Sequence, residues 1–402
     1  MKKKRISMFW YRITSIAALF VARFIFRRKF IRNEIKKLKG PYVIIGNHQA
    51  SLDFVNLMGA TRRPITFVVS NSFYNTLPVK GIMQKIGVIP KQQFQTNITD
   101  LKRMKATIDE GGILCIYPAG LMSEDGLSTP IPHGTYKFLK WLKADIYCAK
   151  TIGTYFAMPK WTRGMRRGRT YLDIYKLFDR EEIAGLDIPE IKEKTDKAIL
   201  FDAYREQEKY LSKFKKNDNI EGLHNVLYMC PHCKKEFSIH VKDKTTLYCD
   251  SCGYEETSDK YGFLHNEKGI GEEIRYPSDW SRLIYNELKT KIADGSESEL
   301  SCDTIIHTID FDKNKYVETG KGVLTITEER FILKGEVKGE ELDIAVPVSY
   351  LASLPFKPGR HVELQHGDQI YRCVLSDGRL AMKYINTLKI HNELNSVKIN
   401  SR

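Results

Sequence analysis

Two pairs of cysteines constrain the fold of this 402-residue chain more tightly than any other feature of its sequence. They read Cys230-Pro-His-Cys233 and, after 15 intervening residues, Cys249-Asp-Ser-Cys252. Each Cys-x-x-Cys turn presents two thiolates together, so two such turns can surround one metal ion tetrahedrally. Four thiolates leave no open coordination position, and the pattern therefore predicts a structural zinc ribbon over residues 224–258. A rubredoxin-like iron site, whose cysteine turns look similar, is the alternative.

The other four cysteines do not show this pairing. They are scattered through apolar stretches, at Cys115, Cys148, Cys302 and Cys373. A disulfide framework would not have this pattern, so the cysteine usage indicates a reducing compartment. Two histidines in the module, His232 and His240, are predicted to be spectators of the four-thiolate site.

The first forty residues carry most of the net charge. They hold 13 Lys or Arg and one acid, so they contribute +12 of the chain's +15. The run Ile13–Phe26 within them is apolar apart from Arg23 and two hydroxyl residues, and its 14 residues fall short of the roughly 20 that a spanning helix needs. Residues 1–40 are therefore predicted to be a basic amphipathic anchor, monotopic or peripheral, on the cytoplasmic face of the membrane. A signal peptide, a spanning helix and a soluble helix are the alternatives.

The overall pI of 9.2 also raises the possibility of nucleic-acid binding. The 362 residues after the first forty carry only about +3, however, and the lysines of the cysteine module are partly balanced by acids. Since the positive charge is interleaved with apolar residues, membrane lipids are the expected partner and nucleic acid is not.

Between residues 41 and 215 short apolar strands alternate with helical stretches, which predicts an α/β sheet domain. A charged helical stretch, Pro189 to Phe214, is expected to close it. The expected strands are Tyr42–Gly46, Ile65–Ser70, Ile113–Tyr117, Ile146–Thr151 and Thr170–Leu177.

The rest of the chain predicts a connecting helix and a β-rich domain. The helix covers residues 277–295, with Ser278 or Asp279 as its N-cap. Residues 300–396 show period-two runs separated by turns and end in a helical stretch. By architecture alone this resembles the pleckstrin-homology-like (PH-like) domains of bacteria.

The segment Asn47-His48-Gln-Ala-Ser51-Leu-Asp53 follows the first expected strand directly. On a continuous helix His48 and Asp53 would point about 140° apart and could not pair. With Ser51 as a helix N-cap, His48 would lie on the loop and Asp53 in the first helical turn, where the carboxylate can meet the imidazole. Such a pair can accept a proton from an attacking hydroxyl. A loop histidine beside a capping Asp is the plainer interpretation.

Two later segments strengthen the catalytic interpretation. Gly87-Val-Ile-Pro-Lys91 is an apolar run that ends in a cation, and Ile113–Tyr117 leads into Pro-Ala-Gly120-Leu-Met-Ser123. With Asn-His-x4-Asp, in this order, they resemble the glycerolipid acyltransferase family typified by 1-acyl-glycerol-3-phosphate acyltransferase, over roughly residues 10 to 180. The resemblance implies catalytic roles for His48 and Asp53. It implies substrate-side roles for Asn47, Lys91, Gly120 and Ser123.

The resemblance is incomplete in the third motif. The family usually reads Phe-Pro-Glu-Gly-Thr-Arg-Ser, whereas this chain has Ala119, Leu121 and Met122 in place of Glu, Thr and Arg. Lys91 stands where the second motif usually ends in an Arg that binds the acceptor phosphate, and a Lys is a point charge rather than a bidentate fork. Another lysolipid, or a different hydroxyl acceptor, is then an alternative to lysophosphatidic acid. Lys150 also stands where the family commonly has an apolar residue.

The resemblance implies an O-acyltransferase that moves a fatty acyl group from acyl-CoA or acyl carrier protein to a lysophospholipid hydroxyl. The alternative is a catalytically inactive, membrane-associated adaptor that binds lipid through the same pocket and partners through the zinc ribbon. Residues 159–161 and the basic run Arg163–Arg169 are interpreted as a solvated surface loop, with contact to an acidic donor or the membrane as the alternative. The expected fold is an α/β acyltransferase domain behind a membrane-associated helix, followed by a small zinc ribbon and a PH-like β domain.

Overall fold

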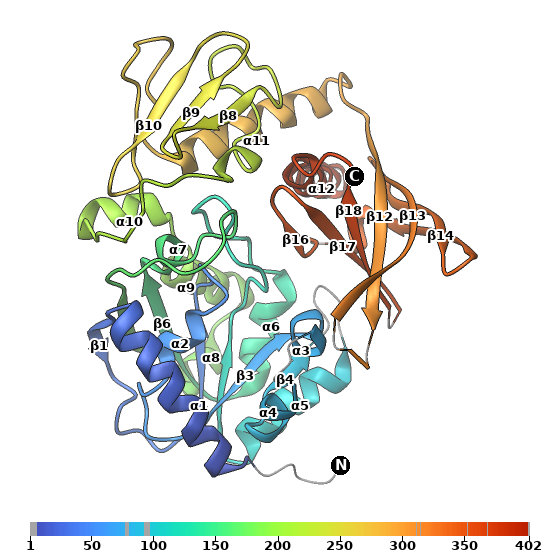
Figure 1. The fold of residues 1–402 in the computed structure, drawn as a ribbon. Helices are drawn as coiled ribbons and strands as arrows, with labels where there is room; N and C mark the ends of the chain where they lie inside the picture. The colour runs from blue at the N-terminus through green and yellow to red at the C-terminus, as the bar shows by residue number, and fades with distance from the viewer. Residues whose placement is uncertain are drawn as a thin grey trace. The chain divides into compact units, whose positions relative to one another are not determined.

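The computed structural model describes residues 6–76, 80–91, 97–310, 312–313, 315–351, 353–367 and 369–400. The first five residues of the expected anchor lie outside this set. The chain divides into two compact units (Figure 1). The first consists of residues 1–217 with 260–262, and the second of residues 218–259 with 263–402.

A seven-stranded sheet forms the centre of the first unit, in the order β1-β7-β6-β2-β5-β3-β4. All described neighbours pair in parallel except β6 and β7, which are antiparallel. β2 lies at the centre and all five of its residues are buried, as a continuous apolar run predicts for a strand covered on both faces. The strands are β1 (Lys29–Asn33), β2 (Tyr42–Gly46), β3 (Ile65–Ser70), β4 (Ile89–Lys91), β5 (Ile113–Ile116), β6 (Asp145–Ile152) and β7 (Tyr171–Phe178).

The α/β prediction is therefore confirmed, but two of the seven strands, β1 and β4, were not among those expected. β1 reads Lys-Phe-Ile-Arg-Asn and lies within the predicted basic anchor, so its charge hid its strand character. It pairs in parallel with β7 at the edge of the sheet. An edge strand can carry exposed cations without disturbing the core.

Short helices connect the strands of this unit (Figure 1). Those before β6 are α2 (Asp53–Leu57), α3 (Asn71–Thr76), α4 (Lys80–Lys85), α5 (Ile98–Asp109) and α6 (His133–Leu142). Those after it are α7 (Thr154–Ala157), α8 (Arg180–Gly185), α9 (Ile188–Ile199) and α10 (Ala203–Tyr210).

The expectation of one charged helical stretch from Pro189 to Phe214 is wrong. The chain forms α9, becomes extended at Leu200, and starts again as α10. Asp202 accounts for the restart, because its side chain accepts hydrogen bonds from the backbone N–H groups of Tyr204 and Arg205. An aspartate at this position satisfies the free N–H groups of a first turn and favours a new helix there.

The N-terminal helix is longer than the apolar run suggested. α1 (Met8–Phe20) continues into a wider π-helical turn at Val21–Ile25, which gives an 18-residue apolar helix of mean hydropathy 1.4. By length and composition this helix could cross a membrane. The short apolar run Ile13–Phe26 therefore does not count against a spanning helix. Small residues, Ala18 and Ala22, face the unit, and the Tyr11 hydroxyl accepts a hydrogen bond from the Ile65 N–H at 2.9 Å.

The second unit begins with the cysteine module. Its antiparallel sheet has the order β11-β10-β9-β8, with β8 (Ile239–Lys242), β9 (Thr246–Cys249), β10 (Glu255–Ser258) and β11 (Leu264–His265). The helix α11 (Pro277–Ala293) follows, as predicted. Its N-cap is Tyr276 rather than Ser278 or Asp279, because Pro277 occupies the first helical position, where its fixed φ suits the helix start.

A second seven-stranded sheet, wholly antiparallel in its described pairs, makes up most of the remainder. Its order is β15-β14-β13-β12-β18-β17-β16. The strands are β12 (Glu299–Asp310), β13 (Lys315–Thr327), β14 (Arg330–Val337), β15 (Glu340–Pro347), β16 (Phe356–Lys357), β17 (His361–His366) and β18 (Gln369–Leu375), and the helix α12 (Leu380–Asn400) closes the chain. The Tyr384 hydroxyl of α12 donates to the carbonyl of Leu324 at 2.6 Å, which ties the helix to the sheet.

Candidate active site

His48 and Asp53 meet at the carboxyl end of β2. Nδ1 of His48 lies 2.9 Å from Oδ2 of Asp53, and the Asp53 side chain is fully buried while that of His48 is partly exposed. The same Oδ2 accepts the backbone N–H groups of Gln49 and Ala50, at 2.7 and 2.9 Å. The carboxylate therefore closes the loop on itself and holds the imidazole by one nitrogen. Nε2 is left as the nitrogen that can exchange a proton with a substrate.

The loop reaches this geometry without the cap that the sequence suggested. α2 begins at Asp53, its N-cap position is Leu52, and no side chain caps it. The Ser51 hydroxyl is directed instead to the sulfur of Met158, at 3.4 Å. The prediction that Ser51 is the N-cap is wrong, because the Asp53 carboxylate already binds the N–H groups of this turn.

Gln49 supports the loop from the other side, and no pattern in the sequence predicts this role. It is fully buried, and its Oε1 accepts hydrogen bonds from the Thr154 hydroxyl and the Tyr155 N–H, both at 3.1 Å. Its Nε2 lies 3.4 Å from a carboxylate oxygen of Glu206 on α10. Gln49 thus connects the loop to α7 and α10, which lie more than 100 residues further along the chain.

Lys150, which departs from the family pattern, has its explanation in the same place. Its Nζ lies 2.8 Å from Oε1 of Glu206. Burial raises the pKa of Glu206, and the positive charge of Lys150 opposes that rise. The cation on β6 therefore serves to hold the carboxylate that contacts Gln49.

Asn47, expected on the substrate side, joins two strands. Its Nδ2 donates to the Thr151 carbonyl and its Oδ1 accepts from the Thr151 N–H, each at 2.7 Å. The residue is buried, and both ends of its amide are used by β6. This contact holds the first residue of the loop against the sheet.

The third-motif turn packs directly on the histidine. The ring of Tyr117, which follows β5, stacks on His48 with centroids 4.6 Å apart and planes 23° apart. Ser123 donates its N–H to the His48 carbonyl at 3.2 Å, and its hydroxyl accepts from the Gly126 N–H at 2.9 Å. Gly120 has a φ of +71°, a value that favours glycine, and its N–H donates to the Tyr117 carbonyl. Gly120 and Ser123 therefore shape the turn that backs the imidazole.

Lys91 ends β4, further along the same edge of the sheet. Two strands, β5 and β3, separate β4 from β2, which places the two backbones about 14 Å apart. Burial lowers the pKa of Lys91, and the nearby carboxylate of Asp100 opposes that shift. Because these four strands are parallel, Lys91 and His48 both lie at carboxyl ends, where open α/β sheets place their sites.

A small hollow of about 10 Å³, with room for about one water molecule, opens to solvent beside His48. Its walls are largely apolar or hydroxyl-bearing, and no Lys, Arg, Asp or Glu lines it. The lining includes Asn47, Ala119, Ser128, Thr129 and Phe201. Such walls leave the imidazole beside an uncharged surface that can meet an apolar or hydroxyl-bearing group.

The segment after α7 is only partly the solvated loop that was predicted, because several of its residues are buried. The Lys160 side chain is 8% exposed and lies 3.8 Å from the buried carboxylate of Glu124, and Trp161 donates its indole N–H to the Tyr155 hydroxyl at 3.0 Å. Arg166 is also buried and donates to Asn217. Arg163 and Arg167 remain exposed. The basic run is therefore divided between the interior and the surface.

In the second unit the four paired cysteines come together as predicted. The sulfurs of Cys230 and Cys252 lie 3.7 Å apart, as do those of Cys233 and Cys249, and all four lie within 4.8 Å of one another. An ion bound tetrahedrally at about 2.3 Å from each sulfur needs sulfurs about 3.8 Å apart, so this donor set fits zinc. His240, predicted to be a spectator of this cluster, contacts the Asp250 carboxylate at 2.9 Å.

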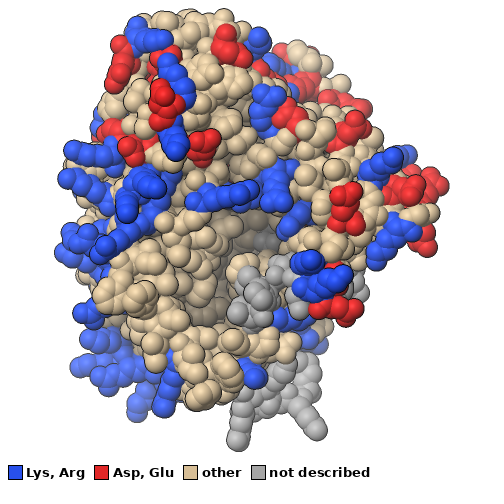
Figure 2. All heavy atoms as spheres, in the orientation of Figure 1, with Lys and Arg blue, Asp and Glu red and all other residues tan. Residues whose placement is uncertain are grey.

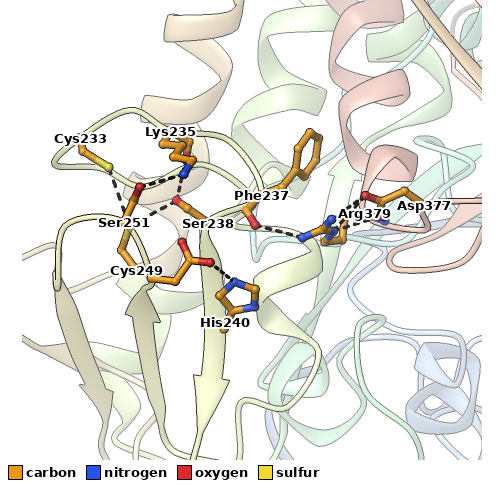
Figure 3. Close-up of polar contacts among 10 residues, drawn as sticks. Cys233, Lys235, Phe237, Ser238, His240, Cys249, Ser251, Asp377 and Arg379 are labelled. Carbon is orange, nitrogen blue, oxygen red and sulfur yellow. Dashed lines mark hydrogen bonds and ion pairs between the residues drawn. The ribbon is translucent and has the colours of Figure 1, made fainter.

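The module is also fastened to the rest of its unit. Arg379, held by Asp377, donates to the carbonyl of Phe237 at 3.0 Å (Figure 3). The buried Lys383 of α12 binds Glu236 at 2.7 Å, and the Trp280 indole of α11 donates to the carbonyl of Met229 at 2.8 Å. The ribbon is thus held to α11 and α12 by buried polar contacts.

Comparison with known proteins agrees with the position of the site. The acyltransferase family model matches residues 27–150, which include β2, the His48 loop and the third-motif turn. No curated protein sequence matches the chain.

Two solved structures are similar at low scores. The 1-acyl-sn-glycerophosphate (LPA) acyltransferase PlsC from Thermotoga maritima is 15% identical, with 46% of this chain and 72% of that chain covered and a TM-score of 0.38. The Ran-binding domain of Nup2 from Ashbya gossypii is 13% identical, with 24% and 97% covered and a TM-score of 0.20. The family match rests on the sequence and coincides with the His48 and Asp53 geometry. Residues 27–150, about a third of the chain, therefore match the acyltransferase family model, and the site lies within them.

Proposed function

We propose that the protein transfers a fatty acyl group from a thioester donor to a hydroxyl of a lysophospholipid. The observation that carries this proposal is the 2.9 Å contact between His48 Nδ1 and the buried Asp53 carboxylate, inside the segment that matches the acyltransferase family. His48 is the general base. Asp53 is a positioning residue that fixes the tautomer and stabilises the imidazolium.

The reaction follows from this arrangement. Nε2 of His48 takes the proton of the acceptor hydroxyl as its oxygen attacks the thioester carbonyl carbon. The tetrahedral intermediate collapses, the carbon–sulfur bond breaks, and the imidazolium returns its proton to the leaving thiolate. The products are an ester and a free thiol, and neither a metal nor a covalent enzyme intermediate is needed. The donor is acyl-CoA or acyl carrier protein.

The acceptor is 1-acylglycerol-3-phosphate or a related lysophospholipid. We assign Lys91 to its phosphate, because this cation lies at the same edge of the sheet as His48 while the hollow beside the imidazole has no charged lining. Asn47, Gly120 and Ser123 act on the substrate indirectly, through the shape of the loop and turn around His48. A single Lys in place of Arg predicts looser selection for a phosphomonoester.

The N-terminal helix supports a place on the membrane surface, and the cysteine usage supports the cytoplasmic face of that membrane. Its large apolar side chains point away from the unit, whereas an amphipathic helix of a soluble protein turns its apolar side inward. The exposed fraction is 44–68% for each of five of them, Phe9, Ile13, Ile16, Phe20 and Phe24. Its small residues face inward, so the helix lies along the unit rather than leaving it. This suits a monotopic helix whose outer face enters one leaflet.

The four-cysteine cluster is proposed to bind Zn²⁺ as a structural ion. Four thiolates saturate the metal, so it would supply no Lewis acid to a substrate. Its residues lie in the ribbon, and the acyl-transfer residues lie in the other unit. The C-terminal sheet with its closing helix is proposed to be a PH-like domain.

The test is acyl transfer by purified protein with a panel of lysophospholipids and glycerol derivatives, each with acyl-CoA and with acyl carrier protein. His48→Ala is expected to reduce turnover at least about 100-fold, with the melting temperature unchanged. His133→Ala, at an exposed histidine of α6, is the matched control and should turn over like the wild type. Absence of turnover with every pair would favour the lipid-binding adaptor.

A further inference from the structure

We propose that the protein has a second membrane contact, a basic face built from three separated segments, which binds anionic lipid headgroups beside the N-terminal helix. The segments are residues 20–33, 163–169 and 211–216. The name "basic face" is used below for the exposed side chains Arg23, Arg27, Arg163, Arg167, Lys213 and Lys215.

Backbone hydrogen bonds bring the three segments together. The Gly168 N–H donates to the Ile25 carbonyl at 3.0 Å, and the Lys215 N–H donates to the Arg167 carbonyl at 2.8 Å. The Arg167 side chain donates to the Phe24 carbonyl at 3.1 Å. The middle segment is therefore held between the end of the N-terminal helix and the chain that follows α10.

The charge of this surface is of one sign. The three segments contain five, four and three Lys or Arg residues in turn, and none contains Asp or Glu. Three of these cations are directed elsewhere, since Arg32 binds Asp173, Arg166 is buried, and Arg28 donates to backbone carbonyls. The others form a positive surface, and in Figure 2 blue side chains follow the edge where Figure 1 places β1 and α10.

Exposed apolar side chains among these cations favour a lipid surface, rather than a nucleic acid, as the partner of the basic face. Phe20, Phe24, Met165 and Leu211 are 44–59% exposed within the same three segments. Exposed Phe, Met and Leu next to Arg and Lys match the boundary of a bilayer, where apolar groups enter the acyl region and cations meet anionic headgroups. Phe20 and Phe24 also belong to the outer side of the N-terminal helix, so the basic face continues that surface.

The experiment measures binding of the full chain to vesicles at 0.15 M salt. One set of vesicles is phosphatidylcholine alone, and the other contains about one third phosphatidylglycerol. Each Lys or Arg near an anionic surface strengthens binding about five-fold. The triple variant Arg163→Gln, Lys213→Gln, Lys215→Gln is therefore expected to bind anionic vesicles about 100-fold more weakly and neutral vesicles unchanged.

A matched triple variant keeps the change in net charge the same. Lys102→Gln, Lys137→Gln, Lys197→Gln removes three exposed lysines from α5, α6 and α9 and should bind anionic vesicles within a few-fold of wild type. Met165→Ser, which alters no charge, should weaken binding to both vesicle types.

Two results would overturn the proposal. One is an equal loss of vesicle binding in the two triple variants, which would show that binding depends on the net charge of the protein and not on the position of these cations. The other is that the first triple variant binds vesicles like the wild type but no longer binds duplex DNA or acyl carrier protein. That result would assign the basic face to the partner whose binding is lost. Circular dichroism of each variant checks the fold, and the three single substitutions replace the triple variant if it does not fold.

Discussion

The His48 loop and the four-cysteine cluster are both recognisable from short spacings, yet they are built differently. The cysteine sulfurs come from two turns only 15 residues apart, and the β8–β9 pairing between those turns helps to bring them within 4.8 Å. The Asp53 carboxylate also binds locally, but the loop is held from outside by Thr151, Thr154 and Glu206. A spacing is therefore enough to bring four cysteines together, whereas the loop that carries His48 needs the rest of the fold to orient it.

Metal removal should produce the largest effect and should separate the two sites. Binding of a structural zinc ion contributes on the order of 10 kcal/mol to folding in small zinc modules. Chelation, or Cys249→Ser, is expected to unfold the ribbon, seen as faster hydrogen exchange in peptides from residues 226–258. Peptides around β2 should exchange at the wild-type rate.

Cys302→Ser, a cysteine of the same unit outside the cluster, is the control and should leave exchange in the ribbon unchanged. Metal analysis of the purified protein distinguishes zinc from iron. Bound iron, seen as a red protein, would mean that the site holds iron and not zinc. A ribbon that stays folded after complete chelation would contradict a structural role for the metal.

Substitution of the orienting carboxylate should give the next largest effect. Asp53→Asn keeps the size of the side chain but removes the charge that stabilises the imidazolium, so kcat should fall about 100-fold or more. KM for the acceptor should change little, because Asp53 does not face the hollow. Steady-state kinetics measure both. A fall below ten-fold would mean that His48 is oriented by the sheet contacts alone.

The distant support of the loop can be tested through Lys150. In Lys150→Met the buried Glu206 carboxylate loses its cation, and the free energy of unfolding at pH 8 should drop on the order of 2 kcal/mol. Burial already raises the pKa of Glu206, and loss of Lys150 raises it further. Below that raised pKa the folded variant binds a proton that the unfolded chain gives up, so the deficit should shrink as the pH falls.

Denaturant melts between pH 5 and pH 8 measure this dependence. Lys176→Met, on the neighbouring strand β7 and mostly solvated in its ion pairs, is the control and should show a smaller deficit. A Lys150→Met deficit that grows as the pH falls would contradict the assigned role of Glu206.

The smallest effect is expected at Ser51. An N-cap serine contributes about 1 kcal/mol to stability, but the Ser51 hydroxyl meets only the Met158 sulfur. Ser51→Ala should therefore change the unfolding free energy by less than about 0.5 kcal/mol. Asp202→Ala, which removes a true N-cap at α10, is the comparison and should lose about 1 kcal/mol. Equal losses of unfolding free energy in the two variants would mean that Ser51 is an N-cap, as the sequence analysis expected.

Much of the architecture could be predicted because it depends on local patterns. The central strand β2 is a run of apolar residues, and such a run between turns predicts a buried parallel strand. β1 was missed because charged residues interrupt its pattern, and the break between α9 and α10 was missed because Asp202 resembles any other surface acid. The outward apolar side of the N-terminal helix needed the structure, since a helical period does not tell which side faces the protein.

Sequence by itself determined the clustering of the four cysteines and the pairing of His48 with Asp53, because those partners are at most 22 residues apart and their contacts follow from chain geometry. Tertiary structure alone decided that Gln49 joins the loop to Thr154 and that Lys150 meets Glu206. It also decided that the basic segments around residues 25, 167 and 215 form one surface. These contacts join positions up to about 190 residues apart, and no spacing or period in a sequence encodes which distant segments the sheet will place side by side.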